Sequence, residues 1–91
     1  MQTSMIKLVA IQPAQVAALN LTFSDGATGR WSAASLIARD TELTRPLADS
    51  AYFARAFIEG GALAWPNGLE LSAPSLHRRL DEAGALLRKA A

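Results

Sequence analysis

Residues 15–32, QVAALNLTFSDGATGRWS, decide the fold, because they hold two extended runs on either side of a strong turn signal. Leu19, Leu21 and Phe23 share one parity and alternate with polar residues, which is the pattern of a strand with one buried face. The turn signal is Ser24-Asp25-Gly26, since Asp and Gly tolerate the left-handed backbone of tight turns. We therefore predict an antiparallel hairpin in this stretch.

The sequence on both sides extends this hairpin. Residues 5–11 are apolar and partly β-branched, so they predict a strand before it. Residues 28–32 form the returning strand, with Trp31 as its anchor. Pro13 lacks the N–H that a strand ladder needs, so it marks a connection or an edge strand. Together these segments predict a three-stranded meander.

A second group of elements follows a polar loop. Asp49 is a good N-cap for a short helix from Ser50 to about Phe57. Residues 62–71, ALAWPNGLEL, predict a second hairpin, in which Asn67-Gly68 supplies the left-handed residues of the turn.

A C-terminal helix is predicted from Ser72, whose hydroxyl can cap it. Gly84 either ends this helix after Ala83 or lies inside it at a cost of about 1 kcal/mol. We expect one α+β domain over residues 1–91, with an antiparallel sheet of about five strands, a short middle helix and this C-terminal helix. Residues 81–91 extend the helix or form a tail.

The composition excludes several classes of protein. The 91 residues contain no cysteine and one histidine, which excludes disulfides, thiolate chemistry and metal sites built on several histidines. The net charge of +1 gives no strong attraction to nucleic acid or to an anionic membrane. No apolar run approaches the roughly 20 residues of a membrane span, so we expect a soluble cytoplasmic protein. Neither a cofactor nor a metal is predicted.

Two groups of motifs resemble one bacterial family. Phe23-Ser24-Asp25-Gly26 is similar to an F-x-D-G motif that the family carries in an early hairpin. Trp65-Pro66-Asn67-Gly68, followed by Glu70-Leu71, is similar to a WPNG-x-[DE]-L motif. The residues that precede this motif in the family's order are Pro46, Leu47, Asp49, Phe53 and Gly61. Over about residues 6–80 the chain resembles domain-of-unknown-function family 2442.

The resemblance implies an α+β fold of antiparallel strands and short helices, found alone or before a helix-turn-helix domain. Stand-alone members resemble one half of a small regulatory or toxin–antitoxin-like pair. Ala48 and Ser50 depart from the family's pattern, in which a polar residue and a proline are common. The resemblance implies no catalytic residue, and none is assigned.

Two sets of residues are candidate binding sites. Trp65, Asn67 and Glu70 could form a recognition loop with a flat indole, whereas the more ordinary explanation is a hairpin turn with the tryptophan in the core. Arg78 and Arg79 could contact phosphate or an acidic partner, or could belong to a solvated helix face. Further basic residues near the C-terminus are Arg88 and Lys89.

Acidic residues offer a third candidate. Asp25, Asp49 and Glu70 could converge as a cluster for a metal or for acid/base chemistry, although each also suits a local role in a turn, a cap or a strand face. His77 would need an orienting partner and a nucleophile to act as a base. The ordinary alternative is a surface or interface histidine.

Apolar residues predict an interface. Nineteen alanines raise the hydrophobic fraction to 51 % while large apolar side chains stay few, so the core is thin for this length. We expect the C-terminal helix to pack against a partner protein or a second copy, as in a homodimer. Its candidate interface residues are Leu80, Ala83, Leu86, Leu87 and Ala90. The aromatic residues that form the core or line a ligand pocket are Trp31, Tyr52, Phe53 and Phe57.

These observations favour a non-enzymatic protein-interaction module, in line with the paired arrangement that the resemblance implies. Two alternatives stay open. One is a nucleic-acid-associated regulator that uses the basic C-terminal helix. The other is a small-ligand binder or enzyme that uses the acidic cluster.

Overall fold

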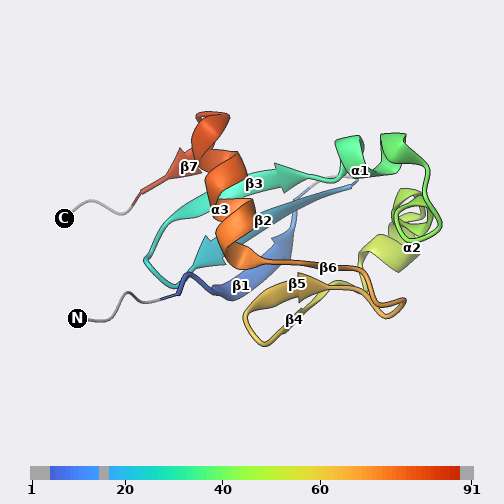
Figure 1. Ribbon diagram of the computed structural model, residues 1–91, viewed down its shortest axis with the longest axis horizontal. Coiled ribbons are helices and arrows are strands. Elements are labelled where there is room, and N and C mark those ends of the chain that lie inside the picture. Colours follow the sequence, from blue (N-terminus) through green and yellow to red (C-terminus); the bar gives the residue numbers. More distant parts are fainter. Residues whose placement is uncertain (1–4, 15–16, 89–91) are drawn as a thin grey trace.

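The computed structural model describes residues 5–14 and 17–88, and it confirms the α+β class (Figure 1). In chain order the elements are β1 (Leu8–Pro13), β2 (Ala18–Phe23), β3 (Thr28–Ser32), α1 (Ala34–Arg39), the 3-10 helix η1 (Arg45–Ala48), α2 (Ser50–Phe53), β4 (Phe57–Glu59), β5 (Ala62–Ala64), β6 (Glu70–Leu71), α3 (Ala73–Glu82) and β7 (Leu86–Leu87). The strands form two antiparallel sheets rather than the single sheet that the sequence predicts.

The first sheet has the strand order β1-β2-β3-β7 and contains the predicted meander. Leu19, Leu21 and Phe23 are buried on one face of β2, while Asn20 is exposed on the other. The alternation assigned from the sequence is therefore confirmed. Pro13 is the last residue of β1, which lies at the edge of the sheet, as its missing N–H requires.

The second sheet has the order β4-β5-β6 and contains the second predicted hairpin. Leu63 pairs with Leu71, and Ala64 pairs with Glu70. The third strand, β4, was not expected there. Phe57 pairs with Ala64 in this strand instead of ending the helix that begins after Asp49.

The helix after Asp49 is shorter than predicted. Asp49 caps α2 as expected, because its Oδ1 accepts a hydrogen bond from the Ala51 N–H at 2.9 Å. After Phe53, where α2 ends, the hydrogen bonds change to the i→i−3 kind of a turn. The N–H groups of Arg55 and Ala56 donate to the carbonyl oxygens of Tyr52 and Phe53. Pairing with β5 draws the following residues into an extended strand.

Helix α1 was not predicted, although residues 33–38 are apolar apart from Ser35. It has six residues and buries only Leu36 among them. A helix of less than two turns presents too few buried positions for a period to show in the sequence.

The C-terminal helix α3 begins as predicted and ends sooner. The Ser72 hydroxyl accepts a hydrogen bond from the Ser75 N–H at 3.3 Å. At the other end, the Gly84 N–H bonds to the Asp81 carbonyl and the Ala85 N–H to the Leu80 carbonyl, and Gly84 has φ +72°. These are the two bonds of a Schellman motif, which stops the helix.

Of the two alternatives for Gly84, the helix that continues past it and carries Leu86 and Leu87 on its apolar face is therefore wrong. Leu86 and Leu87 form β7 and pair with Gly29 and Thr28 of β3, so they do not share a helical face with Leu80. Ala90 lies outside the described residues. No helix among the residues that the structure describes is long and apolar enough to cross a membrane.

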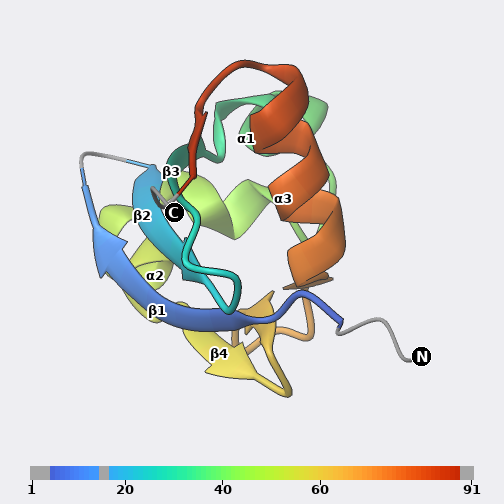
Figure 2. The same cartoon turned by 90° about the vertical axis from the view of Figure 1, so that its left-hand side faces the viewer.

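One hydrophobic core joins the two sheets and the helices. β1–β3 curve around one side of it, and α1 and α3 lie opposite (Figure 2). α3 approaches β3 so closely that a Cβ on Gly29 would lie 2.7 Å from Leu80 Cδ1 and 3.1 Å from the Ala85 carbonyl oxygen. Glycine at position 29 therefore allows α3 and the segment before β7 to pack on the sheet.

Gly29→Ala tests this close approach. We expect it to lower the free energy of unfolding by about 1–3 kcal/mol, because the added methyl group overpacks a buried contact with the backbone before β7. Urea denaturation followed by circular dichroism measures the effect. Arg30→Ala is the control, since Arg30 is exposed on the opposite face of the same strand. Equal stability of Gly29→Ala and wild type would contradict the packing constraint.

Candidate functional site

The predicted recognition loop keeps its tryptophan in the core. Trp65 is 1 % exposed, and its indole Nε1 donates a hydrogen bond to the Phe53 carbonyl oxygen at 3.1 Å. Its ring lies tilted against those of Trp31 and Phe53, with centroids 6.2 and 5.7 Å away. This burial leaves no open indole face on which a ligand could stack.

Asn67 holds the turn by its side chain, not by a left-handed backbone. Only Gly68 of the Asn67-Gly68 pair has a positive φ. The Asn67 side chain accepts from the Leu69 N–H and donates to the Leu43 carbonyl oxygen, both at 3.1 Å. The backbone N–H of Asn67 donates to the Tyr52 hydroxyl at 3.0 Å. The turn thereby fastens the second sheet to α2, through Tyr52, and to the loop before it, through Leu43.

The three carboxylates of the predicted acidic cluster serve separate elements. Asp49 caps α2, Glu70 lies exposed on β6, and Asp25 lies in the turn between β2 and β3. Within the described residues, no group of three or more His, Asp or Glu side chains could hold a metal ion. The acidic cluster expected from the sequence is not formed.

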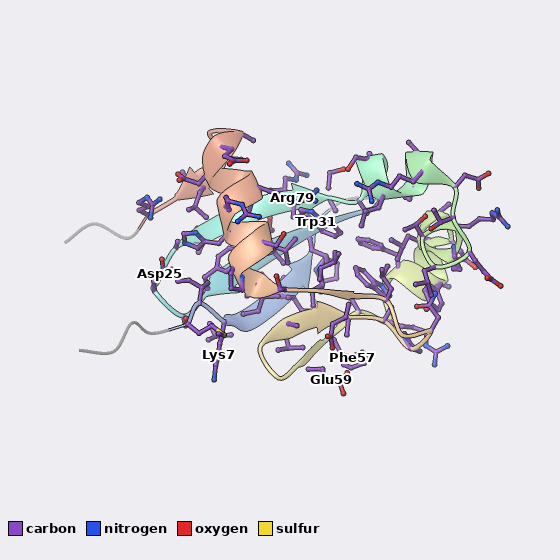
Figure 3. All side chains as sticks on the ribbon, in the orientation of Figure 1. Lys7, Asp25, Trp31, Phe57, Glu59 and Arg79 are labelled. Atoms are coloured by element: carbon purple, nitrogen blue, oxygen red, sulfur yellow. The ribbon has the colours of Figure 1, made fainter. Side chains whose placement is uncertain are left out.

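Asp25 instead meets His77 from α3. The Asp25 Oδ2 lies 2.9 Å from the His77 Nε2, and the histidine side chain is 14 % exposed (Figure 3 labels Asp25 at the β2–β3 turn). Its ring packs edge-on against Phe23, with a centroid distance of 5.0 Å. The orienting partner that His77 would need is therefore present, while no nucleophile is hydrogen-bonded to it in the described part of the chain.

The environment of Asp25 favours its charged form. Its Oδ1 accepts a hydrogen bond from the Ala27 N–H at 2.9 Å, and this bond is the main cause that holds the pKa of Asp25 below its ordinary value. The hydrogen bond and charge of His77 lower the pKa further, while partial burial opposes them. The pair thus ties the β2–β3 turn to α3.

The outer face of the first sheet is largely exposed in the described part of the chain. It carries the cross-strand rows Gln12–Asn20–Arg30 and Ala10–Thr22–Thr28–Leu87, and at one end the pair Ala18–Ser32, in which Ala18 is buried. The buried core lies on the opposite face, and Leu87 is 69 % exposed. A shallow depression of about 570 Å³ runs across the rows. Sequence alternation could indicate an outward face here, but not that β7 would widen it.

The two arginines of the predicted basic site are separated by the structure. Arg79 lines a small pocket together with Arg39 and Ser35 of α1 and Ser75 of α3. Both arginines are exposed, but Arg78 does not line this pocket. Sequence reasoning missed Arg39 and both serines, because α1 was not predicted and nothing local brings it beside α3.

The remaining candidates are distributed over core and surface. Trp31 and Phe53 are buried, and Phe53 also lines an apolar groove of about 310 Å³ beside β1. Phe57 is 40 % exposed at the β4 edge, and Tyr52 binds the Asn67 turn. The four aromatic residues therefore do not line one common pocket.

Fold and site together define a small α+β domain in which two antiparallel sheets share one core and, among residues 5–14 and 17–88, the outer face of one sheet is largely exposed. A family model described as a protein of unknown function (DUF2442) matches residues 8–82, and the chain belongs to that family. This confirms the family inferred from the motifs. No curated protein and no solved structure matches the chain.

The low pKa of Asp25 predicts a pH-dependent contribution to stability. A carboxylate whose pKa is lower in the folded state stabilises the fold above its unfolded pKa, and this contribution is lost as the pH falls through the folded value. Asp25→Asn should therefore be less stable than wild type near neutral pH, and the difference should shrink below about pH 4.

Urea denaturation at a series of pH values measures this difference. Glu59→Gln, which removes an exposed carboxylate on β4, is the control for the change in net charge. If both variants differed from wild type in the free energy of unfolding by the same pH-dependent amount, the lowered pKa of Asp25 would not be the cause of the effect.

Proposed function

We propose that this domain is a non-enzymatic protein-interaction module, which binds a partner protein or a second copy of itself in the bacterial cytoplasm. The family resemblance suggests a partner from a small regulatory or toxin–antitoxin-like pair. The largely exposed outer face of the first sheet is the observation that carries the proposal.

The chemistry of this face suits a protein surface. Among the members of its two rows, Arg30 is the only charged residue, and the others are small, polar or apolar. Interface centres are depleted in charged residues other than arginine, because burying an unpaired charge is costly. Leu87 adds exposed apolar area at the β7 border of the face, where a partner can remove it from water.

The edge of β7 supplies a second means of recognition. β7 is an outer strand of the first sheet, so one side of its backbone is free of a neighbouring strand in the described residues. A partner strand could add to this edge through backbone hydrogen bonds, while its side chains contact the outer face. The two features are contiguous at Leu87.

The basic helix gives weaker support to a nucleic-acid-associated function. Arg88 pairs with Asp81 at 3.1 Å, so part of the predicted positive charge is already neutralised. Lys89 lies outside the described residues. A phosphate backbone is bound by several cations that release counterions together, and Arg78 and Arg79 alone provide few such contacts.

Two matched variants test the interaction face. Leu87→Ser and Phe57→Ser each replace an exposed apolar side chain on an edge strand, but only Leu87 borders the outer face. The tagged wild-type protein and both variants are used to capture partners from nuclease-treated host lysate at low and high salt, with mass spectrometry. Sedimentation of the purified proteins measures self-association.

We expect Leu87→Ser to lose the partner, or the dimer, that wild type and Phe57→Ser retain. Loss only in Phe57→Ser would move the interface to the second sheet and contradict the use of the outer face. A monomer that captures no protein at either salt concentration would contradict the interaction module itself.

A further inference from the structure

A small pocket between α1, α3 and β6 brings together two basic and two hydroxyl side chains. Arg39 and Ser35 come from α1, and Arg79 and Ser75 come from α3. The volume is about 90 Å³. The apolar part of the lining is made of Trp31, Leu36, Leu71 and Leu76. In Figure 3, Arg79 is labelled on α3, with Trp31 on the strand behind it.

Within the described residues, no ion pair involves the two arginines of this pocket. The ion pairs in residues 5–14 and 17–88 are Asp40–Arg45, Asp25–His77 and Asp81–Arg88, and none of them includes Arg39 or Arg79. No carboxylate lines the pocket either. Arg39 and Arg79 both line this pocket and both are exposed, so positive charge collects beside it, and an anion bound there is attracted by both.

The donors match one kind of anion. Each guanidinium presents a planar fork of N–H donors, which fits the oxygens of a phosphoryl group in pairs. The hydroxyls of Ser35 and Ser75 can donate to the remaining oxygens. Ser75 is the third residue of the ten-residue α3, so the positive end of the helix dipole adds to the field.

We infer that this pocket binds the phosphoryl group of a small phosphorylated molecule. Arg39 and Arg79 hold its charge, and Ser35 and Ser75 orient its oxygens. A duplex or single-stranded nucleic acid would need a row of cations, whereas this pocket gathers its donors at one point. The site lies apart from the outer sheet face, so it does not depend on the interaction proposed above.

The indole N–H resonances of the two tryptophans report phosphate binding in an NMR titration. Trp31 lines the pocket, while the Trp65 indole N–H is already bonded to the Phe53 carbonyl oxygen in the core. The full chain, labelled with ¹⁵N, is titrated with inorganic phosphate, with glycerol 3-phosphate and with sodium chloride at equal ionic strength. We expect the Trp31 indole resonance to shift and saturate with both phosphates but not with chloride, and that of Trp65 to move less.

Neighbouring arginines on α3 give a matched pair of variants. Arg79→Gln should weaken phosphate binding at least about tenfold, because it removes a charge-assisted hydrogen-bond donor. Arg39→Gln should do the same from α1. Arg78→Gln removes the same charge from the next position and should leave binding unchanged. Arg79→Lys keeps the charge without the fork and should give an intermediate affinity.

The outcomes separate the sources of the phosphoryl group. Equal affinity for both phosphates means that the group alone is recognised, and tighter binding of glycerol 3-phosphate means that the site extends to the ester; both support the proposal. Unsaturable shifts with every anion, or equal weakening by Arg78→Gln and Arg79→Gln, would overturn it. Binding of a short oligothymidylate without binding of either phosphate would overturn it as well.

Discussion

The fold depends on the burial of one indole. Trp65 directly follows β5 of the second sheet. Its ring packs against Trp31 of the first sheet and Phe53 of α2, and its indole N–H donates a hydrogen bond to the Phe53 carbonyl oxygen. Aromatic side chains bury more area than any other kind, and this contact joins three elements that are far apart in sequence. A chain rich in alanine has few other side chains that could do so.

The packing of α3 decides which surfaces remain free. Gly29 lets α3 lie close to β3, and the Schellman motif at Gly84 then returns the chain to the sheet as β7. The inner face of the first sheet is buried in the core. With β7 added, the outer face of this sheet is four strands wide. The feature that supports a binding function thus follows from how one helix ends.

The placement of charged side chains also follows from tertiary packing. The net charge of +1 suggests a neutral molecule, yet the structure gathers Arg39 and Arg79 beside two hydroxyls and pairs other charges elsewhere. For the binding of a charged ligand, the local arrangement of charged side chains therefore matters more than the net charge of the protein. The Asp25–His77 pair shows the opposite outcome, since two groups that could do chemistry hold a turn against a helix.

The sequence by itself determined the elements whose signals are local. Alternation fixed the buried face of β2, the side chains of Asp49 and Ser72 fixed two helix starts, and Trp65–Gly68 fixed a hairpin. Only the tertiary structure decided the division into two sheets, the strand at Leu86–Leu87, and the placement of Arg39 and Arg79 beside one pocket. Periodicity and capping act within a few residues, whereas these features arise from contacts between segments tens of residues apart, which packing alone selects.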